Sequence, residues 1–84
     1  LDEAAQREAW IDAYVEGWEL RTNPKRPLAM GPASYPKSAR VAEMSGLPFE
    51  KVAFVEYKGG AFALRSLVRA FPGLDNRDEI LATL

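Results

Sequence analysis

The sequence predicts a small all-α domain, and three observations support this fold class. Apolar residues recur at helical spacing in several segments of the chain. Glycine and proline, the residues that end helices, fall between those segments. The chain has 84 residues and is 48% hydrophobic, which suits one domain with a packed core. We therefore expect a single domain over 1–84, built around two short helices that meet in a helix-turn-helix-like core.

Residues 2–21 are predicted to form the first helix. Apolar residues follow an i, i+3, i+4, i+7 stripe, while acidic residues occupy the other side. Asp2 stands where an N-cap is expected. Trp10, Tyr14 and Trp18 give the stripe an aromatic face. We expect this face to pack into the core or against a second protein chain, and it is our candidate interaction face.

Residues 22–36 contain four prolines and one glycine. Proline fixes φ and restricts the residue before it, so we expect a proline-rich loop or arm here. A loop of this length is unusual inside a compact domain, which favours a functional role.

Two short helices are predicted next. The first covers 37–45, with Ser34 or Ser38 as its cap and Gly46 as a left-handed stop. The second covers about 48–58 and begins with Pro48 in its first turn, where the missing N–H costs nothing.

The last third of the chain is also predicted to be helical. "KGG" ends the preceding helix, residues 61–71 resume helical spacing, and Asp75 caps a final helix from about residue 76. An alternative remains for 52–64, because "VAFVEYKGGAFAL" also has the pattern of two β-strands around a Gly-Gly turn. The leucine and arginine spacing after Ala61 favours helix over this hairpin.

The composition excludes several kinds of chemistry. The chain has no histidine and no cysteine, so a Ser-His-Asp triad, a cysteine nucleophile and the usual zinc sites are ruled out. Neither a phosphate-binding loop nor a dinucleotide-binding glycine motif is present. We predict that the protein is not an enzyme and uses no cofactor or metal.

Charge is distributed unevenly along the chain. The formal net charge is −1, but residues 1–20 carry six acids against Arg7, and residues 21–42 carry five basic residues with no acid. A basic segment beside an acidic helix is either a phosphate-binding arm or a segment that docks on that helix.

The chain has neither a signal peptide nor an apolar run near the roughly 20 residues of a membrane span. We expect a soluble, intracellular protein of the cytoplasm with no membrane partner. The sequence starts at Leu1 and stops inside the periodic run "RDEILATL", which predicts a piece of a longer chain.

The stretch "SARVAEMSGLPFEKV" has the spacing of a helix-turn-helix. Such a unit needs a small residue where the helices cross, a residue tolerating positive φ in the turn, and apolar residues that hold the second helix. Ala42 and Gly46 meet the first two needs, and the apolar positions are Val41, Leu47, Val52 and Val55.

This spacing predicts a nucleic-acid-binding site on and beside the second helix. Basic side chains would contact phosphates, and two aromatic side chains would lie near the groove. The predicted site residues are Lys37, Arg40, Lys51, Phe54, Tyr57 and Lys58. Glu50 and Glu56 lie on the same helix and oppose phosphate binding.

The segment "EAWIDAYVEG" resembles the opening helix of phage terminase small subunits. "SARVAEMSGLPFEKV" looks like the reading unit that follows it in that family, and "RDEILATL" is similar to the next helix. The resemblance implies an all-helical DNA-recognition domain, a ring-shaped homo-oligomer formed through more C-terminal segments, and a partner ATPase subunit.

The function expected from the sequence is therefore DNA binding without catalysis, by a helix-turn-helix-like module in phage DNA packaging. The alternative is a helical protein-protein interaction module, or a small non-catalytic subunit of a larger complex, in which the aromatic face of the first helix meets the partner.

Overall fold

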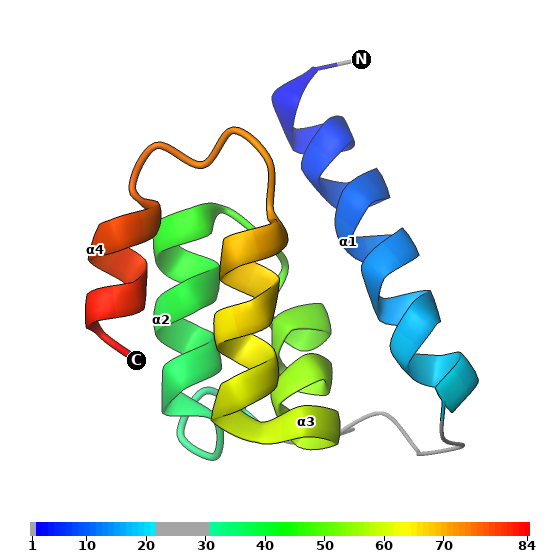
Figure 1. Cartoon of the computed structure of the whole chain (residues 1–84), viewed down its shortest axis with the longest axis vertical. Coiled ribbons are helices and arrows are strands. Elements are labelled where there is room, and N and C mark those ends of the chain that lie inside the picture. The colour runs from blue at the N-terminus through cyan, green and yellow to red at the C-terminus, as the bar shows by residue number, and fades with distance from the viewer. Residues whose placement is uncertain (1, 22–30) are drawn as a thin grey trace.

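The computed structural model describes residues 2–21 and 31–84, which form a compact all-α domain of four helices (Figure 1). The predicted fold class is confirmed at this level. The described residues contain no strand, so the hairpin considered for 52–64 is wrong. The helices are α1 (Glu3–Arg21), α2 (Pro36–Ser45), α3 (Phe49–Ala70) and α4 (Arg77–Ala82).

Helix α3 consists of two helical segments joined at a kink. Gly60 has φ 67° and ψ −161°, a backbone conformation that is essentially restricted to glycine. The first segment is 49–59 and the second is 61–70. The Gly-Gly pair therefore does redirect the chain, as a hairpin turn would, but it does so between two helices (Figure 1).

Helix α1 starts as predicted. The Asp2 carboxylate accepts a hydrogen bond from the backbone N–H of Ala5 at 2.7 Å, which satisfies one of the free donors of the first turn.

The start of α2 differs from the prediction, whereas its end agrees. The residue before the helix is Tyr35, which makes no side-chain cap, so neither Ser34 nor Ser38 caps α2. Ser38 instead lies buried inside the helix, and its hydroxyl donates to Glu56 at 2.6 Å. Gly46 ends α2 with φ 77°, and its N–H donates to the Ala42 carbonyl at 2.9 Å. The left-handed stop is confirmed.

The start of α4 is also corrected. The residue that precedes α4 is Asn76, not Asp75, and its side chain makes no capping hydrogen bond. The Asn76 amide donates instead to the Met44 carbonyl at 2.8 Å, so it ties α4 to the end of α2.

The proline-rich segment lies only partly within the described residues. Residues 22–30 fall outside them. Residues 32–34 form a turn, in which the Ser34 N–H donates to the Gly31 carbonyl at 3.0 Å, and Pro36 already opens α2.

Helix α3 contacts each of the other three helices. Helix α1 packs against α3 on one side, α2 packs against it on another, and α4 contacts both α2 and α3 (Figure 1). The core draws on every helix: Ile11, Val15, Val41, Leu47, Val52, Phe54, Val55, Ala63, Leu64, Leu67, Val68, Phe71 and Ile80. Burial of this apolar surface is what holds the short helices together.

Candidate nucleic-acid interface

The helix that the sequence assigns to DNA reading is the first segment of α3, and it is largely buried. Val41, Leu47, Val52 and Val55 hold it as the helix-turn-helix spacing predicts, each at most 4% exposed. However, the four consecutive residues Val52–Val55 are all buried. Four consecutive positions span a full turn, so the segment is covered on every side there and offers no continuous face to a groove.

Phe54 is not a surface residue. Its side chain is 0% exposed and belongs to the core, so the prediction that it points outward is wrong. Helical periodicity predicts one buried face, as for a helix with one packing partner. The first segment of α3 instead packs against α1 and α2 and shares its core with the second segment, so Phe54 is buried as well.

Lys51 is held by α1. Its ammonium donates to Glu8 at 2.7 Å and also to Asp12, and its side chain is only 22% exposed. The hydrogen bond to Asp12 and then that to Glu8 raise the pKa of Lys51 above its ordinary value. A phosphate would have to compete with two carboxylates for this charge. The structure therefore favours a role for Lys51 in docking α1.

The remaining predicted residues lie at the surface in two neighbouring places. Arg40 is exposed and Lys37 is half-buried, both on α2, and neither has an ion pair among the described residues. Tyr57 is 45% exposed, and Lys58 lies half-buried with its ammonium 5.4 Å from the centre of the Phe54 ring.

A hydrogen bond joins these two places. The Ser38 hydroxyl donates to Glu56 at 2.6 Å, which fixes the first turns of α2 beside the last turn of the first segment of α3. Tyr35 lies close by, and its pKa is raised by burial and by the charges of Glu56 and Tyr57. Lys37 and Tyr57, which neighbour the bonded pair in the sequence, are thereby brought to the same end of the domain.

The outer face of the second segment of α3 is not among the sites that the sequence predicts. Ala63, Leu64, Leu67 and Val68 turn toward the core. On the opposite side lie Phe62, Arg65 and Arg69, at positions i, i+3 and i+7, which share one face of a helix. We call these three residues the arginine stripe. Phe62 is 74% exposed, Arg69 is exposed and Arg65 is half-buried.

The surroundings of the arginine stripe are free of acidic residues along the chain. Residues 57–74 contain Lys58, Arg65 and Arg69 but no aspartate or glutamate. This acid-free run is visible in the sequence and could have predicted a phosphate-binding surface. The helix-turn-helix spacing instead predicted the site on the preceding segment. Helix α2, which carries Arg40, packs against α3 (Figure 1).

The aromatic face of α1 packs against α3. Trp10 stacks on Tyr14 with ring centres 5.2 Å apart, and it also meets Phe71 at 4.9 Å. All three aromatic residues of the face, including Trp18, are partly buried against the core. Contact with the core is confirmed, and contact with a second chain stays a prediction.

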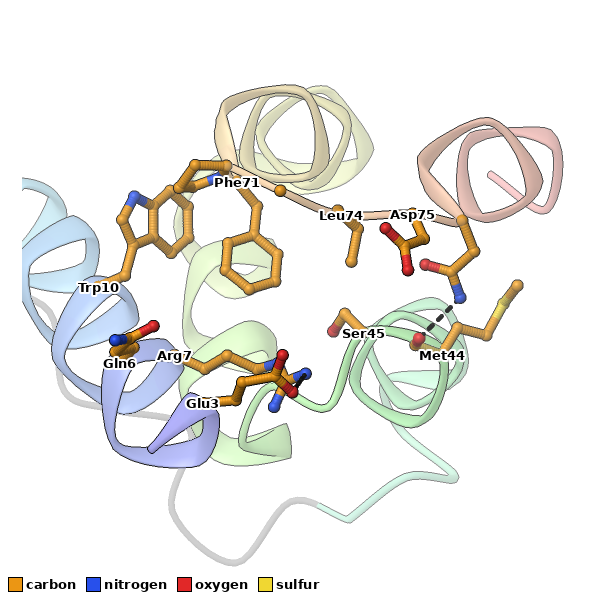
Figure 2. Close-up of a pocket in the computed structure, with 12 residues that line it drawn as sticks. Glu3, Gln6, Arg7, Trp10, Met44, Ser45, Phe71, Leu74 and Asp75 are labelled. Atoms are coloured by element: carbon orange, nitrogen blue, oxygen red, sulfur yellow. Dashed lines mark hydrogen bonds and ion pairs between the residues drawn. The ribbon is translucent and has the colours of Figure 1, made fainter. Parts of the chain in front are cut away.

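An open cleft of about 680 Å³ lies between α1, the end of α2 and the loop from α3 to α4 (Figure 2). Trp10, Phe71 and Leu74 line its apolar part, and Arg7 reaches in from α1 beside Glu3, 3.5 Å away. In the described part of the chain, no buried side-chain nitrogen or oxygen lacks a hydrogen-bond partner. The cleft therefore holds no buried polar group that awaits a ligand, and we assign it none.

The described ranges, 2–21 and 31–84, contain neither a membrane-spanning helix nor a metal-binding cluster. No helix there is both long and apolar enough to cross a membrane. No group of three or more aspartate, glutamate, histidine or cysteine residues in these ranges is placed to hold a metal ion.

Comparison of the chain with protein-family models, with curated proteins and with solved structures found no match.

Proposed function

We propose that this domain binds DNA without catalysis, through the arginine stripe and Arg40 on α2. The observation that carries the proposal is the surface position of Arg65 and Arg69 and their lack of ion-pair partners in the described part of the chain. They share the outward face of one helical segment, lie in an acid-free run and have no ion pair among the described residues.

Three other cations of the described residues already have partners within the domain. Lys51 is held by Glu8 and Asp12, and Arg7 pairs with Glu3 at 3.5 Å. Arg77 donates to the backbone carbonyls of Val68, at 3.1 Å, and Phe71. A cation without such a partner gains most from a phosphate, because binding releases counterions and breaks no existing contact. This contrast favours the arginine stripe and Arg40 as phosphate contacts.

In this proposal the helix-turn-helix-like pair is a scaffold. Helix α2, the turn at 46–48 and the first segment of α3 bury the apolar residues that this spacing requires. The pair then positions the second segment of α3, which contacts the ligand. The resemblance of 8–17 and 38–52 to phage terminase small subunits supports a DNA ligand and suggests DNA packaging as the setting.

A second candidate function is protein-protein interaction. Phe62 and Tyr57 are the large apolar side chains that the described residues expose, at 74% and 45%. Exposed aromatic residues beside arginines are typical of protein interfaces as well. The two functions differ in their dependence on salt and in the mass of the particle in solution.

A salt titration of DNA affinity tests the proposal. On duplex DNA, log affinity falls as log salt rises, and each neutralised phosphate contributes close to one unit to the steepness of this slope. Three arginines therefore predict a slope of about −3. Arg69→Gln and Arg40→Gln should each reduce its steepness by about one. Arg7→Gln is the matched control, since it removes the same charge from a side chain already paired with Glu3. Absence of binding at low salt, together with an oligomer in a mass measurement, would support protein interaction instead.

A further inference from the structure

Phe62 is largely exposed, and packing among the described residues does not explain why a phenylalanine stands there. It is 74% exposed and stands two residues after the Gly60 kink, at the start of the second segment of α3. A phenylalanine left in water forgoes the gain that burial of its ring would bring. Such a side chain is available for contact with a ligand.

The position of Phe62 couples its ring to the two arginines. Phe62, Arg65 and Arg69 occupy one face over seven residues, a rise of about 10 Å along the helix axis. Tyr57, itself 45% exposed, lies on the other side of the kink. An aromatic ring in line with cations, without an acid between 57 and 74, has the composition of surfaces that bind single strands.

We propose that Phe62 stacks on an unpaired base while Arg65 and Arg69 contact the flanking phosphates. The ligand class is then single-stranded DNA, or DNA with locally opened base pairs, and this inference rests on the function proposed above. In an intact duplex each base is already stacked on both faces. A ring can reach it only after unstacking, which favours single strands at this surface.

The charge of the arginine stripe favours a nucleic acid over a protein as its ligand. The charged groups of the stripe are both guanidinium groups, which pair with phosphate and also stack on flat rings. A purely apolar protein contact does not require two cations beside the ring, whereas a base with its flanking phosphates uses the ring and both cations at once. We therefore favour nucleic acid, and a second copy of this chain becomes an outcome of the test.

The experiment compares binding of a mixed-sequence single strand and the corresponding duplex by four proteins: wild type, Phe62→Leu, Phe62→Trp and Arg69→Gln. Wild type should bind the single strand more tightly. Phe62→Leu should weaken single-strand binding about tenfold with little change for the duplex, because leucine keeps the apolar contact but lacks a ring. Phe62→Trp should retain single-strand affinity, and Arg69→Gln should weaken both ligands alike.

The failures of the two proposals are distinguishable. If Phe62→Leu weakens both ligands equally, or neither, the stacking inference is overturned, while a shallower salt slope for Arg69→Gln still supports DNA binding. If neither ligand binds, both proposals fall. If Phe62→Leu instead abolishes self-association in sedimentation, the ring serves a contact between copies and the stacking inference is overturned. Phe62 and Arg69 both lie at the surface, so their variants should fold normally, and an unchanged thermal unfolding midpoint would confirm this.

Discussion

Trp18 packs directly on the backbone of Gly59. A Cβ atom at Gly59 would lie 2.9 Å from Cη2 of the Trp18 ring, closer than real Cβ contacts, and 3.2 Å from Cζ3, which is already tight. This contact joins α1 to the last turn of the first segment of α3. The two adjacent positions thus require glycine for different reasons. Gly59 permits the close approach of Trp18, and Gly60 permits the kink at φ 67°.

Gly59→Ala should destabilise the domain by about 1–3 kcal/mol. The new methyl group would meet the Trp18 ring and the Cβ of Ala63, so the helices must shift or the rings must leave their rotamers. Urea denaturation followed by tryptophan fluorescence measures the change.

Gly17→Ala is the matched control for this substitution. Gly17 lies inside α1, and a Cβ there would meet nothing within 4 Å. Alanine should therefore be neutral or stabilise by about 0.5–1 kcal/mol, as expected for an unstrained helix interior. Equal losses for both variants would contradict the contact between Trp18 and Gly59.

Gly46→Val should destabilise by more than about 1 kcal/mol. Space is sufficient, because a Cβ would lie 3.5 Å from the Arg7 side chain, but φ of 77° strains a β-branched residue. Gly46→Asn is the control, since asparagine tolerates the left-handed region and should cost less. Equal unfolding midpoints for the valine variant and wild type would refute the left-handed stop.

Trp10→Ala should destabilise by about 3 kcal/mol. The substitution removes the stack on Tyr14 and the contact with Phe71, which fix α1 against the end of α3. Trp10→Phe keeps a ring and should lose less. The check on the environment is fluorescence emission, which should lie to the blue of free indole in the folded protein and shift to the red in urea.

Lys51→Met should lower the free energy of unfolding near neutral pH, because it removes the ion pairs with Glu8 and Asp12. The expected loss is only about 0.5–1 kcal/mol, since both carboxylates are more than half exposed. The pKa of Lys51 is higher in the folded than in the unfolded chain. Its contribution is therefore complete below the unfolded pKa, near 10.5, and is lost as pH rises through the folded pKa.

Urea midpoints of wild type and Lys51→Met, measured at about pH 8 and at about pH 12, check this linkage. The difference between the two proteins should be present at the lower pH and be smaller at the higher one. A difference that is independent of pH would show that Lys51 stabilises the domain through packing of its methylene groups rather than through its charge.

The local features of the fold could be predicted from the sequence. Asp2 at the start of α1 and Gly46 at the end of α2 were recognisable because caps and left-handed stops depend on residues a few positions apart. The helical state of 61–70 and the break before it followed from periodicity and the glycine pair. Such signals concern one helix at a time.

The surface, by contrast, was decided by the tertiary structure. Lys51 is paired because α1 packs on the first segment of α3, a contact between residues about 40 positions apart. Phe54 is buried because α3 also packs against α2 and its side chain joins the shared core. Periodicity assigns each helix one buried face and has no means to count the partners that cover it. The sequence by itself determined that these segments are helical and that Gly46 and the Gly59-Gly60 pair interrupt them. Packing between distant segments determined which side chains, Phe62, Arg65 and Arg69 among them, remain available to a ligand.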